Sequence, residues 1–297
     1  MKKINIHFIV NPSAGKGFPK NLNEKIANAF QPHQYHIQLK ETKYKLHAKE
    51  LTIESMAQNA NIIVACGGDG TINEVASCLV NSSIKLGIIP IGSGNGLARN
   101  LRVSKNIESS ISCIKNGDFL SIDVGKINEE YFFSNLGLGF DAQVIHNYQK
   151  INQYPFYSYL KAVFKTVTTN NNSSIFKIQH KKETFSVKPF LLFITNSNQM
   201  GYNLSLHKRA SLTDGQLDLI SIPSISLIEK LYLGFLLLIG KTDFFNKKNH
   251  LPFTQLTIKK NDHKEWKYQK DGEKCFLTGN ECQIKIVSKS LHVICPT

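Results

Sequence analysis

Three glycines surround one aspartate in the stretch Gly67-Gly68-Asp69-Gly70-Thr71. Glycine lets the backbone turn sharply and bring its N–H groups close to a ligand. The apolar run 62–66 before the stretch predicts a buried strand, and apolar residues at helical spacing after it predict a helix. A helix N-terminus attracts anions, and a carboxylate can join such a site only through a cation or a bound proton. The stretch therefore predicts a site for a nucleotide polyphosphate with a divalent metal. A capped strand-to-helix turn without a ligand is the alternative.

Two other glycine-containing turns follow apolar segments that are predicted to be strands. Residues 11–17 follow Ile4–Val10, and residues 91–96 follow Lys85–Pro90. The first turn resembles a P-loop but lacks its first glycine and its Ser/Thr, so a phosphate cradle and a plain loop both remain open. The second lacks the third glycine of a dinucleotide fingerprint because Leu97 stands there. In a parallel sheet the carboxyl ends of the strands share one edge, so we expect all three turns to gather there.

The order of predicted elements indicates two kinds of domain. Up to about residue 120, strands alternate with helices, which predicts a mainly parallel sheet covered by helices. The expected strands are 4–10, 35–39, 62–66 and 85–90, and the expected helices are 21–30, one with Thr42 near its start, one after Thr71, and 107–114. Later segments are short strands, which predicts a β-rich second domain. Its expected strands are 121–127, 131–136, 175–180, 184–187, 190–196, 217–221, 254–259, 274–278 and 283–287, with helices at 154–168 and 225–239.

The chain is strongly basic, with a formal net charge of +14. This charge suits an anionic partner, but the sequence has no recognition helix, zinc-finger spacing or aromatic RNA-binding signature, so we expect no nucleic acid partner. Many lysines lie between residues 241 and 270. They are either a solvated face or a patch that docks on an anionic membrane surface.

The cysteines and the apolar tracts indicate a compartment. No pair of cysteines has C-x-x-C spacing, which is typical of reduced thiols in a cytoplasmic protein. His33 and His36 stand close together without further ligands, so no zinc site is expected there. The tract 231–239 is about half as long as a membrane span. We therefore expect a cytoplasmic protein, peripheral on the inner face of the membrane.

Five motifs occur in an order that resembles the soluble lipid kinase family, which comprises bacterial diacylglycerol kinases with sphingosine and ceramide kinases as relatives. They are residues 11–17, Gly67–Thr71 with Asn73-Glu74, Pro90-x-Gly92-Ser93-Gly94-Asn95, Asp214-Gly215-x-Leu217-Asp218, and Asp271-Gly272-Glu273. The resemblance implies an N-terminal α/β domain like those of NAD kinases and phosphofructokinases, covering 1–120 plus about 291–297. It also implies a C-terminal β-sandwich-like domain over 121–290, with the active site in the cleft between the domains.

The resemblance also implies a role for particular residues. The implied ATP contacts are Asn11, Pro12, Ser13, Ala14, Gly15, Thr42, Gly67, Gly68, Asp69, Gly70, Thr71, Ile72, Asn73 and Ser93, with Lys16 as a basic residue near the phosphates. The implied magnesium ligands are the side chain of Asp214 and the carbonyls of Ser211 and Gln216. Asp69 and Asp123 would reach the ion through water. The general base would be Asp271 or Glu273.

These roles also make sense as chemistry. Phosphoryl transfer to an alcohol needs charge neutralisation, alignment and an acceptor for the hydroxyl proton. Mg²⁺ prefers oxygen ligands, and a carboxylate can act as the base. Taken alone, however, Asp-Gly-Glu is typical of a hairpin turn, and Asp214-Gly215 allows the same interpretation. Asp141 either faces a lipid headgroup or caps a helix.

The function predicted from these motifs is an ATP- and Mg-dependent lipid kinase that converts diacylglycerol to phosphatidic acid. Many bacterial diacylglycerol kinases carry an aspartate after the asparagine of the second glycine turn, whereas Gly96 follows Asn95 here. A long-chain base or another lipid is therefore an alternative acceptor. NAD kinase is a further enzymatic alternative, and a nucleotide- or membrane-binding protein without turnover is a non-enzymatic one. The sequence does not determine the oligomeric state, and a homodimer is one possibility.

Overall fold

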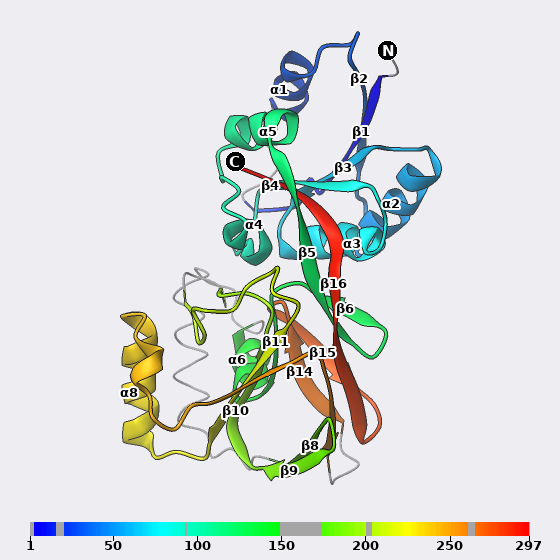
Figure 1. Cartoon of the computed structure of the whole chain (residues 1–297). Coiled ribbons are helices and arrows are strands. Elements are labelled where there is room, and N and C mark those ends of the chain that lie inside the picture. Colours follow the sequence, from blue (N-terminus) through cyan, green and yellow to red (C-terminus); the bar gives the residue numbers. More distant parts are fainter. Residues whose placement is uncertain are drawn as a thin grey trace. The chain divides into compact units, whose positions relative to one another are not determined.

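The computed structural model describes residues 3–15, 21–92, 94–148, 174–199, 204–260 and 265–296 (Figure 1). The chain divides into two compact units, one of Met1–Ile122 with Lys289–Thr297 and one of Asp123–Ser288. The boundaries fall inside two strands, β5 (Asp118–Ile127) and β16 (Glu281–Cys295). The prediction that the site lies between the domains stays a prediction, and each unit is described by itself.

The first unit contains the predicted parallel sheet. Its strand order is β2 (Tyr35–Glu41), β1 (Ile4–Val10), β3 (Ile62–Gly67) and β4 (Lys85–Pro90), all parallel. The end of β16 adds to β4 through Val293 and Leu86. The apolar runs of β1, β3 and β4 are almost wholly buried, as expected for strands covered on both faces. The fold prediction for this unit is confirmed.

Helices cover the sheet of the first unit. They are α1 (Leu22–Ala29), α2 (His47–Ala57), α3 (Asp69–Leu79), the short α4 (Gly96–Asn100) and α5 (Ile107–Asn116). Helices α1 and α5 pack together with side chains of β1 and β3, while α2 packs against α3 (Figure 1). The helix expected to start near Thr42 begins instead at His47. The Thr42 N–H donates to the Val10 carbonyl (2.8 Å), and Leu46 is left-handed (φ 70°), so the chain leaves the sheet through a turn first.

The second unit is the predicted sandwich of antiparallel sheets. One sheet has the order β12 (Asn249–Phe253), β11 (Leu217–Pro223), β10 (Pro189–Thr195), β7 (Asn135–Gly139), β14 (Trp266–Lys270) and β15 (Glu273–Leu277). The other contains β13 (Gln255–Lys260), β8 (Phe176–His180), β9 (Glu183–Val187), β5, β6 (Glu130–Phe132) and the first part of β16. Apolar side chains from both sheets, including Phe132 and Trp266, form one buried cluster. This core holds the two sheets together.

A helix covers the opposite face of the six-stranded sheet. Helix α8 (Leu227–Leu238) begins with a capping box, in which the Ser226 side chain and Glu229 each accept a backbone N–H of the other residue. Leu233 and Leu236 pack on Ile220 and Phe193 of the sheet. The second unit also contains α6 (Phe140–Tyr148) and the 3₁₀ turn η1 (Thr242–Phe244). Among the described residues, no helix is long and apolar enough to cross a membrane.

Some predictions for the second unit need correction. The segment 131–136, expected as one strand, contains the end of β6 and the start of β7, because the backbone of residues 133–135 turns to bind a side chain described below. Strands β12 and β14 were not predicted. The helix predicted at 154–168 lies outside the described residues.

Candidate functional site

The predicted nucleotide-binding turns of the first unit lie side by side. The strand register aligns Val10 with Cys66 and Gly67 with Pro90, so the turns after β1, β3 and β4 start at the same edge of the sheet. The Asn11 side-chain amide donates to the Thr71 hydroxyl (3.0 Å), which joins the first turn to the central one. A side chain at Gly15, which is left-handed (φ +64°), would lie 2.2 Å from the Ile91 carbonyl oxygen. The first and third turns therefore also pack closely.

Asp69 connects the central turn to the third turn. It is the first residue of α3, and its two carboxylate oxygens accept the backbone N–H groups of Asn95 (2.7 Å) and Gly96 (2.6 Å). A Cβ at Gly94 would lie 2.4 Å from the Asp69 Oδ2 atom, and a Cβ at Gly92 would lie 2.6 Å from the Gly68 Cα. The glycines thus allow two turns to pack at backbone contact. Asp69 holds them in register.

Positive charge surrounds this carboxylate. Burial raises the pKa of Asp69, while the N–H groups of Gly96 and Asn95 and the charge of Arg99 act in the opposite direction. Partial burial and the charge of Arg99 lower the pKa of Lys105, and Asp69 acts against that shift. The sequence did not indicate a role for Arg99 and Lys105, two cations near the glycine turns. Only their position shortly after the third turn could have suggested that they lie close to a bound phosphate.

The start of α3 fits the phosphate groups of a nucleotide. Its N-cap is Gly68, which has no side chain that could satisfy the first N–H groups of the helix. The Asp69 N–H bonds to its own carboxylate, whereas the N–H groups of Gly70 and Thr71 have no partner within the helix and could bind a ligand. That Gly70 and Thr71 contact a nucleotide stays a prediction. Ile72 differs from the prediction, because its side chain is fully buried and its N–H donates to the Gly68 carbonyl (3.0 Å). Lys16 and Ser93 lie outside the described residues.

The other predicted nucleotide contacts lie on turns at the same edge of the sheet or within α3. Thr42 follows directly on β2, whose last residue, Glu41, aligns with Val10. Asn73 lies in the second turn of α3, and its carbonyl accepts the Ser77 hydroxyl (2.6 Å). Pro12 and Ser13 lie on the first turn, where the Ser13 N–H donates to the Asn11 side chain (3.0 Å), and Ala14 is buried beneath it.

The predicted metal ligands of the second unit also lie together. The loop of residues 211–216 leads into β11 and is bound on both sides by Asp123. The Asp123 N–H donates to the Leu212 carbonyl (2.7 Å), and its Oδ2 atom accepts the Gly215 N–H (2.7 Å). Asp123 is fully buried, whereas Asp214 is exposed at the tip of the loop. Ser211 and Gln216 flank Asp214 on this loop. The loop therefore presents carboxylate and carbonyl oxygens on one short segment.

The charges on this loop fit a hard divalent cation. Burial raises the pKa of Asp214, the Gln216 N–H lowers it, and the nearby Asp218 and Asp123 raise it again. Neighbouring carboxylates repel each other when both are ionised, and a cation bound between them stabilises the ionised forms. The donors are all oxygen, which suits Mg²⁺ or another hard ion rather than zinc. Asp69, the remaining predicted carboxylate, belongs to the other unit.

Asp271 lies in a two-residue hairpin turn. Lys270 pairs with Glu273 across β14 and β15, and Asp271 and Gly272 both have positive φ (50° and 80°), as a type I′ turn requires. The Asp271 carboxylate accepts three backbone N–H groups, from Phe133 (2.9 Å), Ser134 (2.7 Å) and Asn135 (3.0 Å). Burial raises the pKa of Asp271 to about 6, and these three donors act against the rise. This carboxylate holds the chain between β6 and β7.

Glu273 is placed differently from Asp271. It is the first residue of β15, and it is exposed. Of the two predicted bases, Asp271 already accepts three hydrogen bonds, whereas Glu273 has a solvent-facing carboxylate that could take a proton from an alcohol. The geometry fits a positioning role for Asp271, and the choice of Glu273 as the base stays a prediction.

Comparison with known proteins shows which domain the chain contains. Residues 5–127 match the family model of the diacylglycerol kinase catalytic domain. The chain therefore contains a diacylglycerol kinase-like lipid kinase catalytic domain. A diacylglycerol kinase of Bacillus subtilis (strain 168) is 26% identical over 305 residues, covering 100% of this chain and 97% of the relative. One of Staphylococcus saprophyticus is 29% identical over 226 residues, covering 74% of this chain and 73% of the relative.

Solved structures share the fold. A structure described as a diacylglycerol kinase from Bacillus anthracis aligns with a TM-score of 0.73 and 22% identity, covering 99% of this chain and 98% of that one. A second Bacillus anthracis structure aligns with a TM-score of 0.80 and 24% identity, covering 99% and 97%. The prediction of a lipid kinase with an α/β domain and a β-sandwich is confirmed at the level of family and fold.

One polar residue that the sequence did not indicate connects two parts of the kinase's second unit. Asn196 is almost fully buried, and its amide donates to the carbonyls of Asp123 (2.8 Å) and Phe133 (3.1 Å). Its own N–H donates to the Ser134 carbonyl (2.9 Å). Asn196 thus connects Asp123, which binds the predicted metal loop, with residues 133–134, which Asp271 binds. In the sequence it is only the last residue of a predicted strand.

A second buried group of the kinase is Asp141, in the first turn of α6. Its exposed fraction is 6%, and its Oδ2 atom has no hydrogen-bond partner among the described residues. Burial raises the pKa of Asp141 to about 6, and a hydrogen bond from Gln269 acts in the opposite direction. A Cβ at Gly137 would lie 2.0 Å from Asp141 Oδ2, so the carboxyl group packs directly on β7.

Replacing Asp141 by asparagine is expected to change how stability depends on pH. The pKa of Asp141 is higher in the folded protein, about 6, than in the unfolded chain. Its carboxyl group therefore contributes stability at a pH below the unfolded pKa, and this contribution is lost as the pH rises towards about 6. The wild-type protein should lose about 3 kcal/mol of unfolding free energy relative to Asp141→Asn between pH 4 and pH 7. Urea unfolding across this range measures the difference. The exposed Asp118→Asn is the control, and an unchanged wild-type slope in Asp141→Asn would contradict the assignment.

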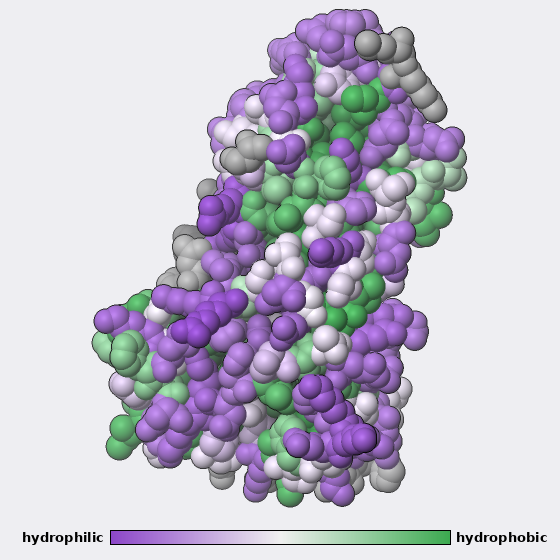
Figure 2. Space-filling view, in the orientation of Figure 1, coloured by the Kyte–Doolittle hydropathy of each residue, from purple (hydrophilic) through white to green (hydrophobic). Residues whose placement is uncertain are grey.

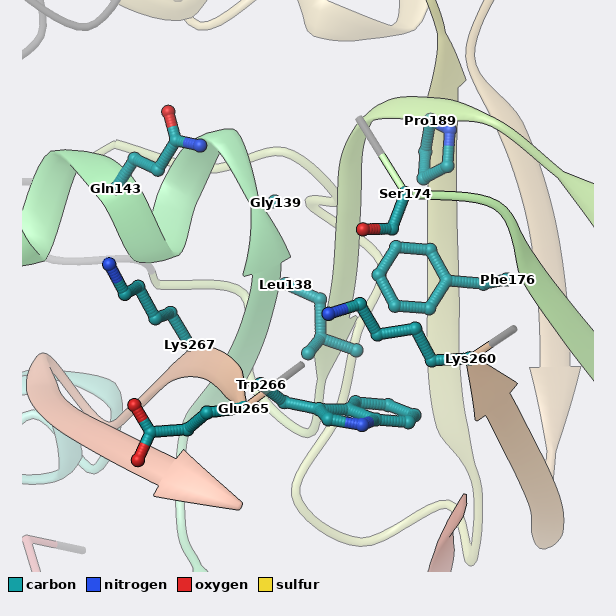
Figure 3. A pocket seen from close by; sticks show the side chains of 10 residues that line it. All are labelled: Leu138, Gly139, Gln143, Ser174, Phe176, Pro189, Lys260, Glu265, Trp266 and Lys267. Carbon is teal, nitrogen blue, oxygen red and sulfur yellow. The ribbon is translucent and has the colours of Figure 1, made fainter. Parts of the chain in front are cut away.

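The sandwich also contains a small cavity of about 150 Å³. Figure 3 shows polar ends from several elements around an apolar base. The lining residues are Leu138, Gly139, Gln143, Ser174, Phe176, Pro189, Lys260, Glu265, Trp266 and Lys267. The volume is below the range typical of ligand pockets, and the lining includes none of the predicted site residues. We assign this cavity no part in the site.

Proposed function

We propose that the chain transfers the γ-phosphoryl group of ATP to the hydroxyl of diacylglycerol, which yields phosphatidic acid and ADP. The observation that carries the proposal is the joining of three glycine turns through Asp69 at the start of α3, within the matched catalytic domain. The turns and the N–H groups of Gly70 and Thr71 at the start of α3 would bind and align the phosphates. The cations Arg99 and Lys105 would balance their charge.

The residues of the second unit supply the rest of the reaction. Asp214, Ser211, Gln216 and Asp123 would hold a divalent cation, for which we propose Mg²⁺. When bound, that ion neutralises charge on the phosphate oxygens. Glu273 accepts the proton of the acceptor hydroxyl, whose oxygen forms a bond to the γ-phosphorus as the bond from that phosphorus to the leaving ADP oxygen breaks. Asp271 and Asn196 position the strands from which these groups project.

A second acceptor deserves a parallel test because of Gly96. This residue stands where many related enzymes carry an aspartate, and its N–H is bound by Asp69 (2.6 Å). The turn thus presents no carboxylate towards the acceptor headgroup, which favours testing a long-chain base as well.

Incubation with labelled ATP tests the proposal. The full chain is mixed with Mg²⁺ and with diacylglycerol, a long-chain base or NAD in separate reactions, the lipids in mixed micelles. Labelled phosphatidic acid is the expected product. Labelled long-chain base phosphate alone would move the acceptor to the second candidate. Phosphorylation of NAD alone, or of no acceptor, would overturn the lipid kinase proposal.

We also propose that α8 docks the protein on an anionic membrane. Four apolar residues at helical spacing form an exposed stripe, with exposed fractions of 79% (Ile228), 58% (Leu231), 56% (Phe235) and 65% (Leu238). The helix lies at the edge of the second unit, where apolar and hydrophilic surface alternate (Figures 1 and 2). Lys230 lies on the same helix, where it covers the Phe190 ring, and Lys247 pairs with Glu229 in the first turn of α8. An exposed apolar stripe on a helix with lysines in the same region suits an interface with anionic lipids.

The double variant Leu231→Glu with Phe235→Glu is expected to bind anionic phospholipid vesicles at least about 100-fold more weakly, because each buried apolar side chain contributes about 1.5–3 kcal/mol. Vesicle sedimentation measures binding. The matched control is Phe185→Glu on β9, an exposed apolar residue of the same unit. Activity on a short-chain, water-soluble diacylglycerol should not change. Equal vesicle binding by the double variant and the wild type would rule out α8 as the docking surface.

A further inference from the structure

Two histidines and one aspartate converge at one edge of the six-stranded sheet, near the loop that carries Asp214. Asp218 lies on β11, His250 lies on β12, and His207 lies on the segment before β11. The Nε2 atom of His250 is 2.7 Å from Asp218 Oδ1, and the Nε2 atom of His207 is 3.9 Å from the same oxygen. One donor atom from each residue lies within 4.8 Å of the others. We propose that these residues form a binding site for Zn²⁺ or a similar divalent transition metal.

The strand register places two of the three donors. Asp218 pairs with Pro252, and Ile220 pairs with His250, so Asp218 and His250 are diagonal neighbours on the same face of antiparallel strands. Asp218 is buried, with an exposed fraction of 7%. A buried carboxylate requires a partner that balances its charge.

The third donor is held by contacts from η1 and the segment after it. The Thr242 hydroxyl donates to the carbonyls of Ser205 and Leu206 (3.2 Å each), and the Lys248 ammonium donates to the Leu206 carbonyl (3.2 Å). The rings of His207 and His250 are 4.3 Å apart between centroids and tilted by 30°. Both imidazoles are therefore fixed next to one carboxylate. Such positioning by surrounding contacts is what a metal site needs.

A hydrogen bond accounts for only one of the two histidines. His250 is within hydrogen-bond distance of Asp218, but 3.9 Å is too long for His207. Zinc binds histidine nitrogen and carboxylate oxygen at about 2.0–2.2 Å, which places neighbouring donor atoms about 3.3 Å apart in a tetrahedral site. The Asp218 Oδ1 atom lies 2.7 Å from His250 Nε2 and 3.9 Å from His207 Nε2, one distance below that value and one above it. Shifts below about 1 Å would complete the site, with a fourth position open to water.

The donor set and the nearby charges decide which ion fits. Two imidazoles and one carboxylate favour zinc and similar transition metals over Mg²⁺, which prefers oxygen alone. The Lys248 ammonium lies close by, but it forms an ion pair with Asp243. Arg209, also near Asp243, is exposed to solvent. With neutral histidines, Asp218 leaves a local negative charge that a divalent cation would balance.

The site shares no ligand with the predicted magnesium loop, although Asp214 lies only four residues before Asp218 and the charge of Asp218 acts on it. It does not rest on the proposed kinase function. An ion bound by His207, Asp218 and His250 would join β11, β12 and the segment before β11, and it would thereby fix the base of the loop that carries Asp214. The expected role is therefore structural support of that loop.

Metal titration of the full chain tests the proposal. Chelator-treated protein is titrated with ZnCl₂ in millimolar Mg²⁺ while a chromophoric chelator competes for zinc. About one ion should bind per chain with micromolar affinity or better. His207→Ala and His250→Ala should each weaken binding by at least roughly 100-fold. The exposed His33→Ala is the matched control, and Asp214→Ala should bind zinc as the wild type does. Zinc should raise the Tm of the wild type and of these two controls.

Other outcomes have a defined meaning. If the wild type binds no zinc, or if both histidine variants bind zinc as tightly as the wild type does, the residues form only a hydrogen-bonded cluster or the cysteines bind the ion, and the proposal is wrong. If the alanine variants do not fold, substitution of Co²⁺ into the wild type decides. Visible absorption bands and histidine NMR signals shifted by the paramagnetic ion support the site, whereas an unchanged histidine spectrum overturns it.

Discussion

Replacing Glu273 by glutamine is expected to lower kcat by a factor of about 10²–10⁴ without changing the thermal stability. Glu273 is an exposed side chain at the start of β15, so the fold has little need of its charge. As a base, however, a carboxylate accepts the hydroxyl proton and an amide cannot. Initial rates with labelled ATP and diacylglycerol, together with thermal unfolding, measure the two effects. The matched control is Glu183→Gln, which alters an exposed glutamate at the start of another strand, β9.

Asp271→Asn should behave in the opposite way. Asparagine tolerates the left-handed conformation of this turn, but its NH₂ group would face backbone N–H groups that the carboxylate now accepts. Hydrogen bonds to a charged group contribute about 1.5–3 kcal/mol each, so the unfolding free energy should fall by about 2–4 kcal/mol. If Asp271→Asn is as stable as the wild type and as inactive as Glu273→Gln, then Asp271 is the base.

The sequence was informative where one local pattern determines both an element and its neighbours. Ile4–Val10 and Lys85–Pro90 have the bounds that were predicted, because each is an apolar run that ends at a turn. Since parallel strands have their carboxyl ends at one edge, the gathering of three glycine turns also followed from the order of the elements. The turn at Asp271-Gly272 was likewise expected from residue type, and the structure has it.

The sequence could not reveal contacts that depend on tertiary pairing. Asp271 binds residues 133–135 only because β14 lies beside β7, and β14 was not predicted. Asn196 acquires its role from two carbonyls that are 73 and 63 positions away. His250 and Asp218 are 32 positions apart, so a search for ligands at short spacing does not find them. Such sites are formed by the register of strands, which residue types alone leave open.

Loss of the hydrogen bonds between Asp69 and the third glycine turn is expected to have the largest effect on activity. Asp69→Ala removes both acceptors of the Asn95 and Gly96 N–H groups, so the turn loses its attachment to α3. We expect activity to fall by more than about 10³-fold, since misplacing aligned groups by 1 Å alone can cost about 10²-fold. ATP affinity should fall with or without Mg²⁺. A loss of affinity only in the presence of Mg²⁺ would instead show that Asp69 acts through the ion.

Gly94→Ala tests the same contact without removing the carboxylate. The added methyl group would lie 2.4 Å from Asp69 Oδ2, so either the turn or the carboxylate must move. Overpacking of this kind destabilises by about 1–3 kcal/mol, and we expect ATP affinity to fall by roughly 10-fold or more. The control is Gly234→Ala in α8, where an added Cβ has no atom within 4 Å. If Gly94→Ala binds ATP as tightly as Gly234→Ala does, the attachment of the turn to Asp69 does not determine nucleotide binding. The effect of Asp69→Ala would then have to come from the lost negative charge.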